Sequence, residues 1–203
     1  MANNEIIMYK VFLTLLILIA ICCESCQTKK GNCITNYYVY GIKESEGCYV
    51  GSSKDGIWKY YYPNGKINAI VHYLSGQKNG QSLEYDKNGR ISSDATYKNG
   101  HFFGIVKFYY PNGNVNTEEY YDEKGLNRGA FKLWYPSGRI SQTGNFVNGK
   151  MVGIWLQYYE SGKIKSNSHY DSLGKKDSIW MFYSVNGSLI KKEKYKADSL
   201  IQK

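Results

Sequence analysis

Residues 129–152 read GAFKLWYPSGRISQTGNFVNGKMV and form one copy of a unit that recurs along most of the chain. Five further copies are recognisable, at steps of 24 or 25 residues. The six units begin at Gly56, Gly80, Gly104, Gly129, Gly153 and Ser178. Repetition at a fixed period of this length is typical of proteins built as arrays of one small structural unit. Positions within a unit are counted from its first residue, which is position 0.

Four positions keep the same chemical character in all six units, and position 9 is always glycine. Position 5 is always aromatic: Tyr61, Tyr85, Tyr109, Trp134, Tyr158 and Tyr183. Position 11 is always aliphatic: Ile67, Ile91, Val115, Ile140, Ile164 and Leu189. Position 17 is again aromatic: Tyr73, Tyr97, Tyr121, Phe146, Tyr170 and Tyr195.

Each unit reads as a β-hairpin. A short aromatic and β-branched run leads into a glycine-containing turn, such as Pro63-Asn64-Gly65, and a second run comes after it. Asn-Gly accepts the positive φ that a type I′ turn requires at both central residues. We therefore predict a two-residue turn at positions 8 and 9, which makes the positions of facing residues sum to 17. A second turn at positions 19 and 20, such as Asn99-Gly100, passes the chain to the next unit.

Alternation along the strands predicts two faces. Positions 0, 2, 4, 6, 11, 13, 15 and 17 share one face, which we expect to be the buried one. The ring at position 17 is expected to cover the backbone of the facing glycine at position 0. Position 5 lies on the other face, where its six rings form a regular row, the position-5 stripe. Such a row either stacks against a sugar or peptide, or packs laterally and serves stability alone.

The predicted fold is therefore all-β: an elongated antiparallel β-meander of about seven stacked hairpins in an open, twisted sheet. The seventh hairpin is a degraded first copy at residues 32–55, where Lys43 replaces the aliphatic position 11. Worn terminal copies are typical of capping repeats. The six regular repeats cover residues 56–197, and residues 197–203 form a short polar end cap. No composition break divides residues 27–203, which predicts a single domain.

Two cysteines of the degraded copy lie opposite each other in the predicted pairing. Cys33 and Cys48 occupy positions 1 and 16, which sum to 17. Cross-strand placement suits a disulfide, and an exported chain allows one. The alternative is two free thiols that lie close together.

Residues 1–26 do not follow the repeat and resemble an export signal. Residues 11–21 are a run of eleven uncharged, largely apolar residues, VFLTLLILIAI. This run is shorter than the roughly 20 residues of a membrane-spanning helix and matches a signal-peptide core. Either Met1 or Met8 is the start of the chain.

The cysteines that follow this run resemble a bacterial lipoprotein signal, in which a cysteine after a small residue is lipidated. Cys26 after Ser25 fits that pattern best, with Cys22 and Cys23 as alternatives. An ordinary cleaved signal or an uncleaved anchor remains open. We predict a membrane-anchored lipoprotein of the bacterial cell envelope, on the periplasmic or outer-membrane face.

The repeat itself resembles a known family. The pattern G-x-W-x-x-Y-Y-x-x-G-x-I is similar to MORN-type repeats in their bacterial variant form, with good matches at Gly56-Ile57-Trp58 and Gly153-Ile154-Trp155. Ser82 and Val106 depart from it where other units have tryptophan. The resemblance implies a scaffold of β-hairpins that binds protein or lipid. Some bacterial members carry an antitoxin label.

Catalytic chemistry has little support in the sequence. The chain contains His72, His101 and His169, and the first and last share position 16 in different units. No nucleophile elbow, phosphate-binding loop or paired metal-ligand spacing is present. We therefore predict a non-enzymatic protein without a catalytic residue, metal or cofactor.

The chain is basic, with a formal net charge of +9, and contains 21 tyrosines. Lysines interleaved with rings occur in proteins that bind single-stranded nucleic acid. Here the rings follow the repeat period, which packing explains, so we expect no nucleic acid. A protein partner or an anionic membrane surface fits better. Free edge strands also allow end-to-end self-association.

The functional prediction is an exported, lipid-anchored scaffold for protein or membrane-surface interaction. Two alternatives stay open. One is an antitoxin-like inhibitor that neutralises a protein partner, and the other is a glycan-binding module that uses the position-5 stripe.

Overall fold

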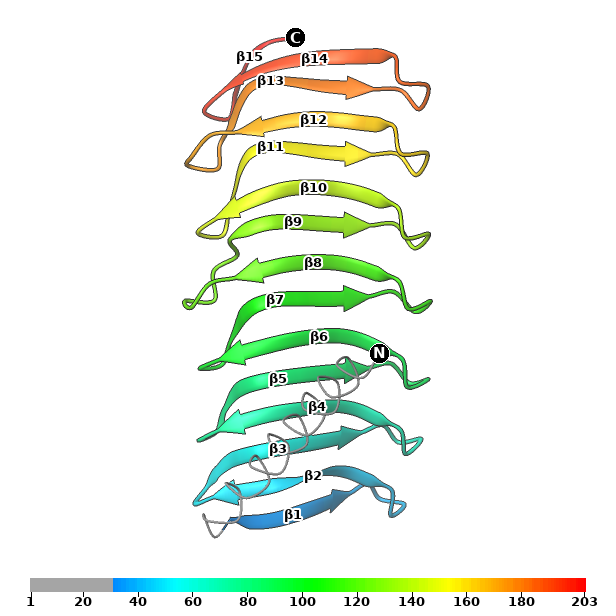
Figure 1. Ribbon diagram of the computed structural model, residues 1–203, viewed down its shortest axis with the longest axis vertical. Coiled ribbons are helices and arrows are strands. Elements are labelled where there is room, and N and C mark those ends of the chain that lie inside the picture. The colour runs from blue at the N-terminus through cyan, green and yellow to red at the C-terminus, as the bar shows by residue number, and fades with distance from the viewer. Residues whose placement is uncertain (1–30) are drawn as a thin grey trace, which may run out of the picture.

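The computed structural model describes residues 31–203, which form one open antiparallel sheet of fifteen strands (Figure 1). The predicted all-β meander is confirmed, since each strand pairs with its neighbours in chain order. The strands are β1 (Asn32–Tyr37), β2 (Lys43–Val50), β3 (Ser53–Tyr61), β4 (Ile67–Leu74), β5 (Gln77–Tyr85), β6 (Ile91–Lys98), β7 (His101–Tyr109), β8 (Val115–Tyr121), β9 (Gly129–Trp134), β10 (Ile140–Val147), β11 (Lys150–Tyr158), β12 (Ile164–Tyr170), β13 (Lys176–Tyr183), β14 (Leu189–Lys196) and β15 (Ser199–Gln202).

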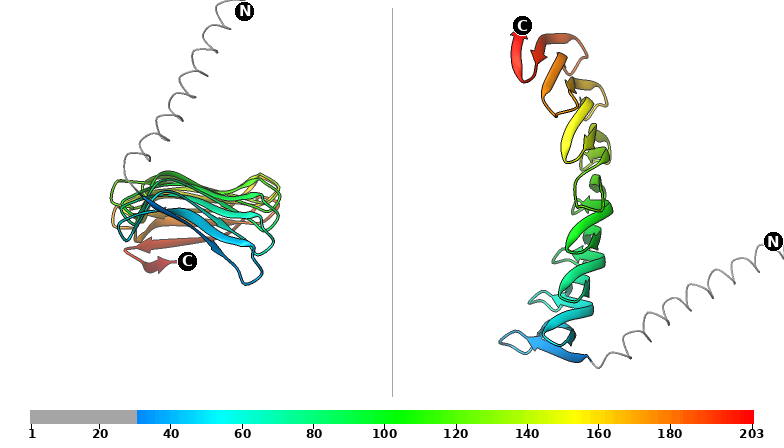
Figure 2. Two further views of the ribbon diagram at one scale, coloured as in Figure 1. Left: turned by 90° about the horizontal axis from the view of Figure 1, so that it is seen from below. Right: turned by 90° about the vertical axis from the view of Figure 1, so that its left-hand side faces the viewer.

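The ribbon is elongated and curves along its long axis (Figure 2). Residues 31–203 contain no helix, and hence none of the length and apolar character that crossing a membrane requires. The predicted signal peptide, with Cys22, Cys23 and Cys26, lies outside the described residues.

The predicted pairing within hairpins is confirmed over most of each ladder. Gly56 pairs with Tyr73, and Trp58 pairs with Val71, so their positions sum to 17. The same pairing of position 0 with position 17 recurs in the other five hairpins. The aromatic ring and the residue at position 0 are therefore cross-strand neighbours throughout the array.

The predicted type I′ turn at positions 8 and 9 is wrong. The Tyr62 carbonyl accepts a hydrogen bond from the Gly65 N–H at 2.9 Å, and the Tyr62 N–H donates to the Lys66 carbonyl at 2.8 Å. These bonds enclose a three-residue loop in which Gly65 has a φ of 80° and Asn64 does not have a positive φ. This is a type I turn followed by a left-handed glycine. The glycine bond recurs in all six hairpins.

A β-bulge at position 12 restores the register after this longer loop. Tyr61 pairs with Ile67 and Tyr60 pairs with Ala69, which leaves Asn68 as the extra residue. All six hairpins have the same shift. Facing residues share a face, so position 11 lies with position 5. The prediction that position 11 belongs to the buried face is therefore wrong.

The second set of turns explains why the step is sometimes 24 and sometimes 25 residues. In a 24-residue step such as the one at Asn99-Gly100, both residues have positive φ, 50° and 84°, as predicted for a type I′ turn. The 25-residue steps contain longer loops that begin at Asp122 and Asp171. Each of these carboxylates accepts two backbone N–H groups of its own loop. The added residue is thus absorbed in a loop and leaves the strands aligned.

Acid is expected to weaken these loops and the turn between β5 and β6, where Asp86 accepts backbone N–H groups in the same way. Backbone N–H donors hold the pKa of Asp86, Asp122 and Asp171 below its usual value. A carboxyl with a lowered folded-state pKa adds stability above its unfolded pKa of about 3.9 and loses it as the pH falls through the folded value. We expect the melting temperature to fall below about pH 4. The melting temperature of the triple Asp→Asn variant should fall less steeply with decreasing pH than that of the wild type. Equal slopes for the two proteins would contradict this account.

The core of the ribbon lies on one face of the sheet, the inner face, and the opposite face is the outer face. Every fully buried side chain in residues 31–203 lies at position 2, 13 or 15, on the face that the sequence predicted to be buried. These residues are Ser45, Trp58, Val71, Ser82, Ser93, Ala95, Val106, Trp155, Ser166, Ser168, Trp180 and Glu193.

Neighbouring hairpins fit each other by size along the inner face. Position 15 of one unit lies beside position 2 of the next, and a Cβ added to Gly144 would lie 2.1 Å from the Trp155 ring. Gly47 stands in the same relation to Trp58. Where position 15 is the larger Val71, the next position 2 is only a serine. Five of the six seams therefore combine a larger side chain with a smaller one, and the exception is Glu119 beside Phe131.

Candidate functional site

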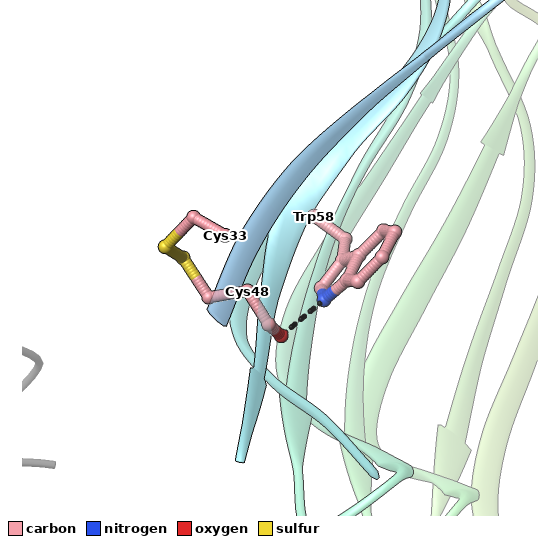
Figure 3. Close-up of a disulfide and its surroundings, with 3 residues drawn as sticks. All are labelled: Cys33, Cys48 and Trp58. Carbon is pink, nitrogen blue, oxygen red and sulfur yellow. Dashed lines mark hydrogen bonds between the residues drawn. A yellow bond between two sulfur atoms is a disulfide. The ribbon is translucent and has the colours of Figure 1, made fainter. Parts of the chain in front are cut away.

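A disulfide closes the first hairpin (Figure 3). Cys33 on β1 and Cys48 on β2 pair directly, and the structure joins their sulfur atoms. The Trp58 indole Nε1 donates a hydrogen bond to the Cys48 carbonyl at 3.0 Å. The degraded copy is thus held covalently within itself and by a buried indole against the first regular repeat.

Removing this cross-link is expected to destabilise the N-terminal end. The cysteines are 15 residues apart, and a loop of that size corresponds to roughly 2–3 kcal/mol of stability. The Cys33→Ser, Cys48→Ser variant should lose about this much in urea unfolding. Hydrogen exchange should show the loss concentrated in β1 and β2. A uniform loss along the ribbon would contradict a local cap.

Tyrosines at position 6 tie five of the hairpins to the next one, while the unit that begins at Gly80 has Asp86 there. Their hydroxyls donate to the position-5 carbonyl of the following unit at 2.6–2.8 Å. The pairs are Tyr38 with Tyr61, Tyr62 with Tyr85, Tyr110 with Trp134, Tyr135 with Tyr158, and Tyr159 with Tyr183. The prediction placed position 6 on the buried face, whereas these five side chains are only partly buried. The recurring aromatic pair at positions 5 and 6 was the available signal.

The Tyr110→Phe variant is expected to lose one of these ties. The hydroxyl donates to the Trp134 carbonyl at 2.7 Å, and a hydrogen bond of this kind contributes about 1 kcal/mol. Urea unfolding should show a loss of that size. Tyr120→Phe is the matched control, because Tyr120 is exposed and has no hydroxyl hydrogen bond within residues 31–203. Equal effects would mean that the tie contributes nothing.

The position-5 stripe lies on the outer face and is half-buried along its whole length. Each ring is the cross-strand neighbour of the aliphatic side chain at position 11. The Tyr61 hydroxyl also donates to Glu46 Oε1 at 2.5 Å, and the Tyr183 hydroxyl contacts Met181 Sδ at 3.3 Å. These contacts favour a packing role for the stripe.

Position 1 forms a second row on the outer face, where alternation along the strands placed it, but this row was not predicted from the sequence as a surface. Position 1 is isoleucine in four units, and these side chains are 49–59 % exposed. They are Ile57, Ile105, Ile154 and Ile179. The signal is weak because the remaining units have Gln81 and Ala130 there. Exposed aliphatic side chains in register along one face are a feature of interaction surfaces.

In three units a lysine at position 3 lies between the isoleucine row and the position-5 stripe, whereas the other units have Leu83, Leu156 and Met181 there. Lys59, Lys107 and Lys132 occupy position 3, and their ammonium groups lie 3.3–3.9 Å from the carboxylates of Glu46 and Glu118. All five side chains are partly exposed, so these ion pairs contribute little to stability. The outer face is therefore aliphatic at its margin and charged along part of its middle.

The structure does not bring the histidines together. His72 and His169 belong to different hairpins at position 16, and His101 begins β7. Across residues 31–203, no group of three His, Cys, Asp or Glu side chains is placed to hold a metal ion. Burial raises the pKa of the inner-face Tyr73 hydroxyl to about 12.

Comparison with known families identifies part of the array. Residues 54–74, 78–99, 104–123 and 151–172 match the family described as MORN repeat variant. These segments correspond to the hairpins β3–β4, β5–β6, β7–β8 and β11–β12. No curated protein matches the chain. Repeats of this family are generally non-catalytic and mediate protein or membrane interaction, as the resemblance in the sequence implied.

Proposed function

We propose that this chain is a non-enzymatic scaffold, held at the bacterial cell envelope by a lipid on Cys26, whose outer face binds a protein partner. The observation that supports this most directly is the row of exposed isoleucines at position 1. The inner face already buries its own central side chains. The outer face is therefore the one with apolar surface to spare.

Each exposed isoleucine can contribute a small free energy of binding, and the repeat places these side chains at regular intervals. Removing half of an isoleucine side chain from water contributes roughly 1 kcal/mol. Adjacent strands lie about 4.8 Å apart, so position 1 recurs about every 10 Å, and Ile57, Ile105 and Ile154, which alternate with Gln81 and Ala130, recur about every 20 Å. A partner that follows the ribbon meets several such side chains in turn, and Lys59 and Lys107 lie two residues along the strand from Ile57 and Ile105. The charged groups add selectivity more than affinity.

The cap supports an envelope location. A disulfide persists in an oxidising compartment, as outside the bacterial cytoplasm. Cys26 precedes β1 by six residues, a span of at most about 20 Å when extended. A lipid there would keep the β1 end close to the membrane, with the later repeats reaching away from it or along it.

Palmitate labelling and cell fractionation test the anchor. The full-length protein should carry label and sediment with membranes, and Cys26→Ser should lose both properties. Cys22→Ser and Cys23→Ser are matched controls that should keep them. An unlabelled cytosolic wild-type protein would reject the anchor, and would favour the antitoxin-like inhibitor.

Affinity capture from membranes tests the outer face. The Ile105→Glu, Ile154→Glu variant should lose partners that the wild-type chain retains, by about tenfold or more. Leu173 and Val185 are equally exposed, at 61 % and 56 %, but lie in loops. Leu173→Glu, Val185→Glu is therefore the matched control and should capture partners normally. Equal capture by both variants would exclude the isoleucine row.

The glycan-binding alternative depends on the position-5 stripe. Its rings are half-buried and flanked by position 11, which favours packing. A glycan array with the wild-type chain and the Trp134→Ala and Tyr158→Ala variants separates the two roles. Binding that both substitutions remove would support the glycan module.

A further inference from the structure

The inner face contains aromatic sites that the chain fills with its own lysines. The residue two before position 0, position −2, pairs with position 17 of the preceding unit. In three units it is lysine, namely Lys54, Lys78 and Lys176. Their ammonium groups lie 4.3 Å from the Trp58 ring centre, 4.6 Å from that of Tyr97 and 4.8 Å from that of Trp180. At these distances a ring face attracts a cation.

The unit that begins at Gly129 has the rings without the lysine. Phe131 and Phe146 stand at positions 2 and 17, with ring centres 5.7 Å apart. Position −2 is Asn127. It forms a β-bridge with Tyr121, which is equivalent to the pairing of Lys176 with Tyr170. Asparagine is too short to place a group over these rings. In residues 31–203 no lysine ammonium lies over either ring.

The same site carries a carboxylate that the equivalent sites in the other units lack. Glu119 stands at position 15 of the preceding unit, where the seams that lead to Trp58, Trp155 and Trp180 have glycine or serine. Its Oε2 accepts a hydrogen bond from the Tyr121 hydroxyl, and it forms no ion pair within residues 31–203. The pairing of Thr117 with Leu133 sets β8 and β9 in the common register, so Glu119 belongs beside Phe131.

An unused acceptor lies at this seam. The side-chain carbonyl oxygen of Asn127 is buried and has no hydrogen-bond partner within the described chain. A buried polar atom without a partner costs about 1–3 kcal/mol, so a donor supplied from outside would be favourable. Strand pairing is also sparse here, with two paired positions between β8 and β9.

We propose that Glu119, Asn127, Phe131 and Phe146 form a binding site for a primary alkylammonium group, presented as a lysine side chain by a protein partner. The rings attract the charge, while the carboxylate and the amide oxygen accept its N–H groups. A quaternary ammonium has no N–H to donate, which favours the primary amine. This site is on the inner face, so the proposal does not depend on the role of the isoleucine row on the outer face.

The test is an NMR titration of the full-length protein with labelled phenylalanine rings, using Nα-acetyl-lysine methylamide as the probe. The ring signals of Phe131 and Phe146 should shift and saturate. Glu119→Gln should raise the dissociation constant about tenfold. Glu118→Gln is the matched control, because Glu118 lies one residue away on the outer face and should not affect binding.

Two further arms separate the sources of any shift. Acetylation of the probe's side-chain amine removes its charge and should abolish the shifts. Asn127→Lys, which copies the filled units, should occupy the site and block the probe. Equal shifts with the acetylated probe, equal affinity for tetramethylammonium, or unchanged affinity in Glu119→Gln would each overturn the assignment. Glu119→Gln is nearly isosteric, so this last arm remains informative if Asn127→Lys fails to fold.

Discussion

Replacing Gly144 with valine is expected to lower the free energy of unfolding by about 3 kcal/mol, the upper range for overpacking a core. The first added carbon would lie 2.1 Å from the Trp155 ring, which is itself packed against Phe131 and Phe146 at 5.3 and 5.0 Å between ring centres. The indole is 3 % exposed, so the added methyl groups must displace packed rings. Urea unfolding followed by circular dichroism measures the loss.

A second substitution tests the cause of that loss. Combining Gly144→Val with Trp155→Ser copies the natural Val71 and Ser82 seam, so the two changes should cost less together than their sum. Thr143→Val is the matched control, because Thr143 is the neighbouring residue on the outer face and is half-buried. A single Gly144→Val variant as stable as the wild type would contradict the size-matched seam.

Replacing Trp58 with alanine is expected to cost more, about 4 kcal/mol. The side chain is 1 % exposed, and its ring lies 5.0 Å from Tyr49 and 6.4 Å from Tyr73. The substitution also leaves the Cys48 carbonyl without its indole donor and removes the ring beneath the Lys54 ammonium. The substitution therefore creates a cavity and removes a hydrogen bond and a cation–π contact at the same time.

The matched control is Trp134→Ala on the outer face. Trp134 is only half-buried, so truncation should cost about 1–2 kcal/mol. Both variants are compared by urea unfolding. Losses of similar size would mean that the inner face contributes no more than the outer one.

The period, the hairpins and most of the strand pairing could be predicted because they depend on residues that repeat without exception. The turn at positions 8 and 9 could not. Asn-Gly fits a type I′ turn, but it also fits a type I turn followed by a left-handed glycine. Pro63 and Pro111 favour the latter, because proline presets the first position of a type I turn.

The bulge was hidden for a related reason. The extra residue at position 12 differs from unit to unit, from Asn68 to Lys165 to Ile190, so no column of the repeat marks it. Without it, strict alternation assigns Ile67 and its equivalents to the wrong face. The face of position 1 could be predicted, but its row of isoleucines was not recognised as a surface, since Gln81 and Ala130 interrupt it. What varies between copies is where single-sequence periodicity gives no guidance.

The size matching at the seams has a consequence for how such a ribbon assembles. Near-identical hairpins invite docking out of order, because any one resembles the next. Gly47 accepts an indole, whereas Val71 accepts only a small neighbour, so hairpins that dock in the wrong order either collide or leave a void. Each junction thereby admits only a successor of matching size. Loss or duplication of a unit would be tolerated only where the residues at position 15 and at the next position 2 again differ in size.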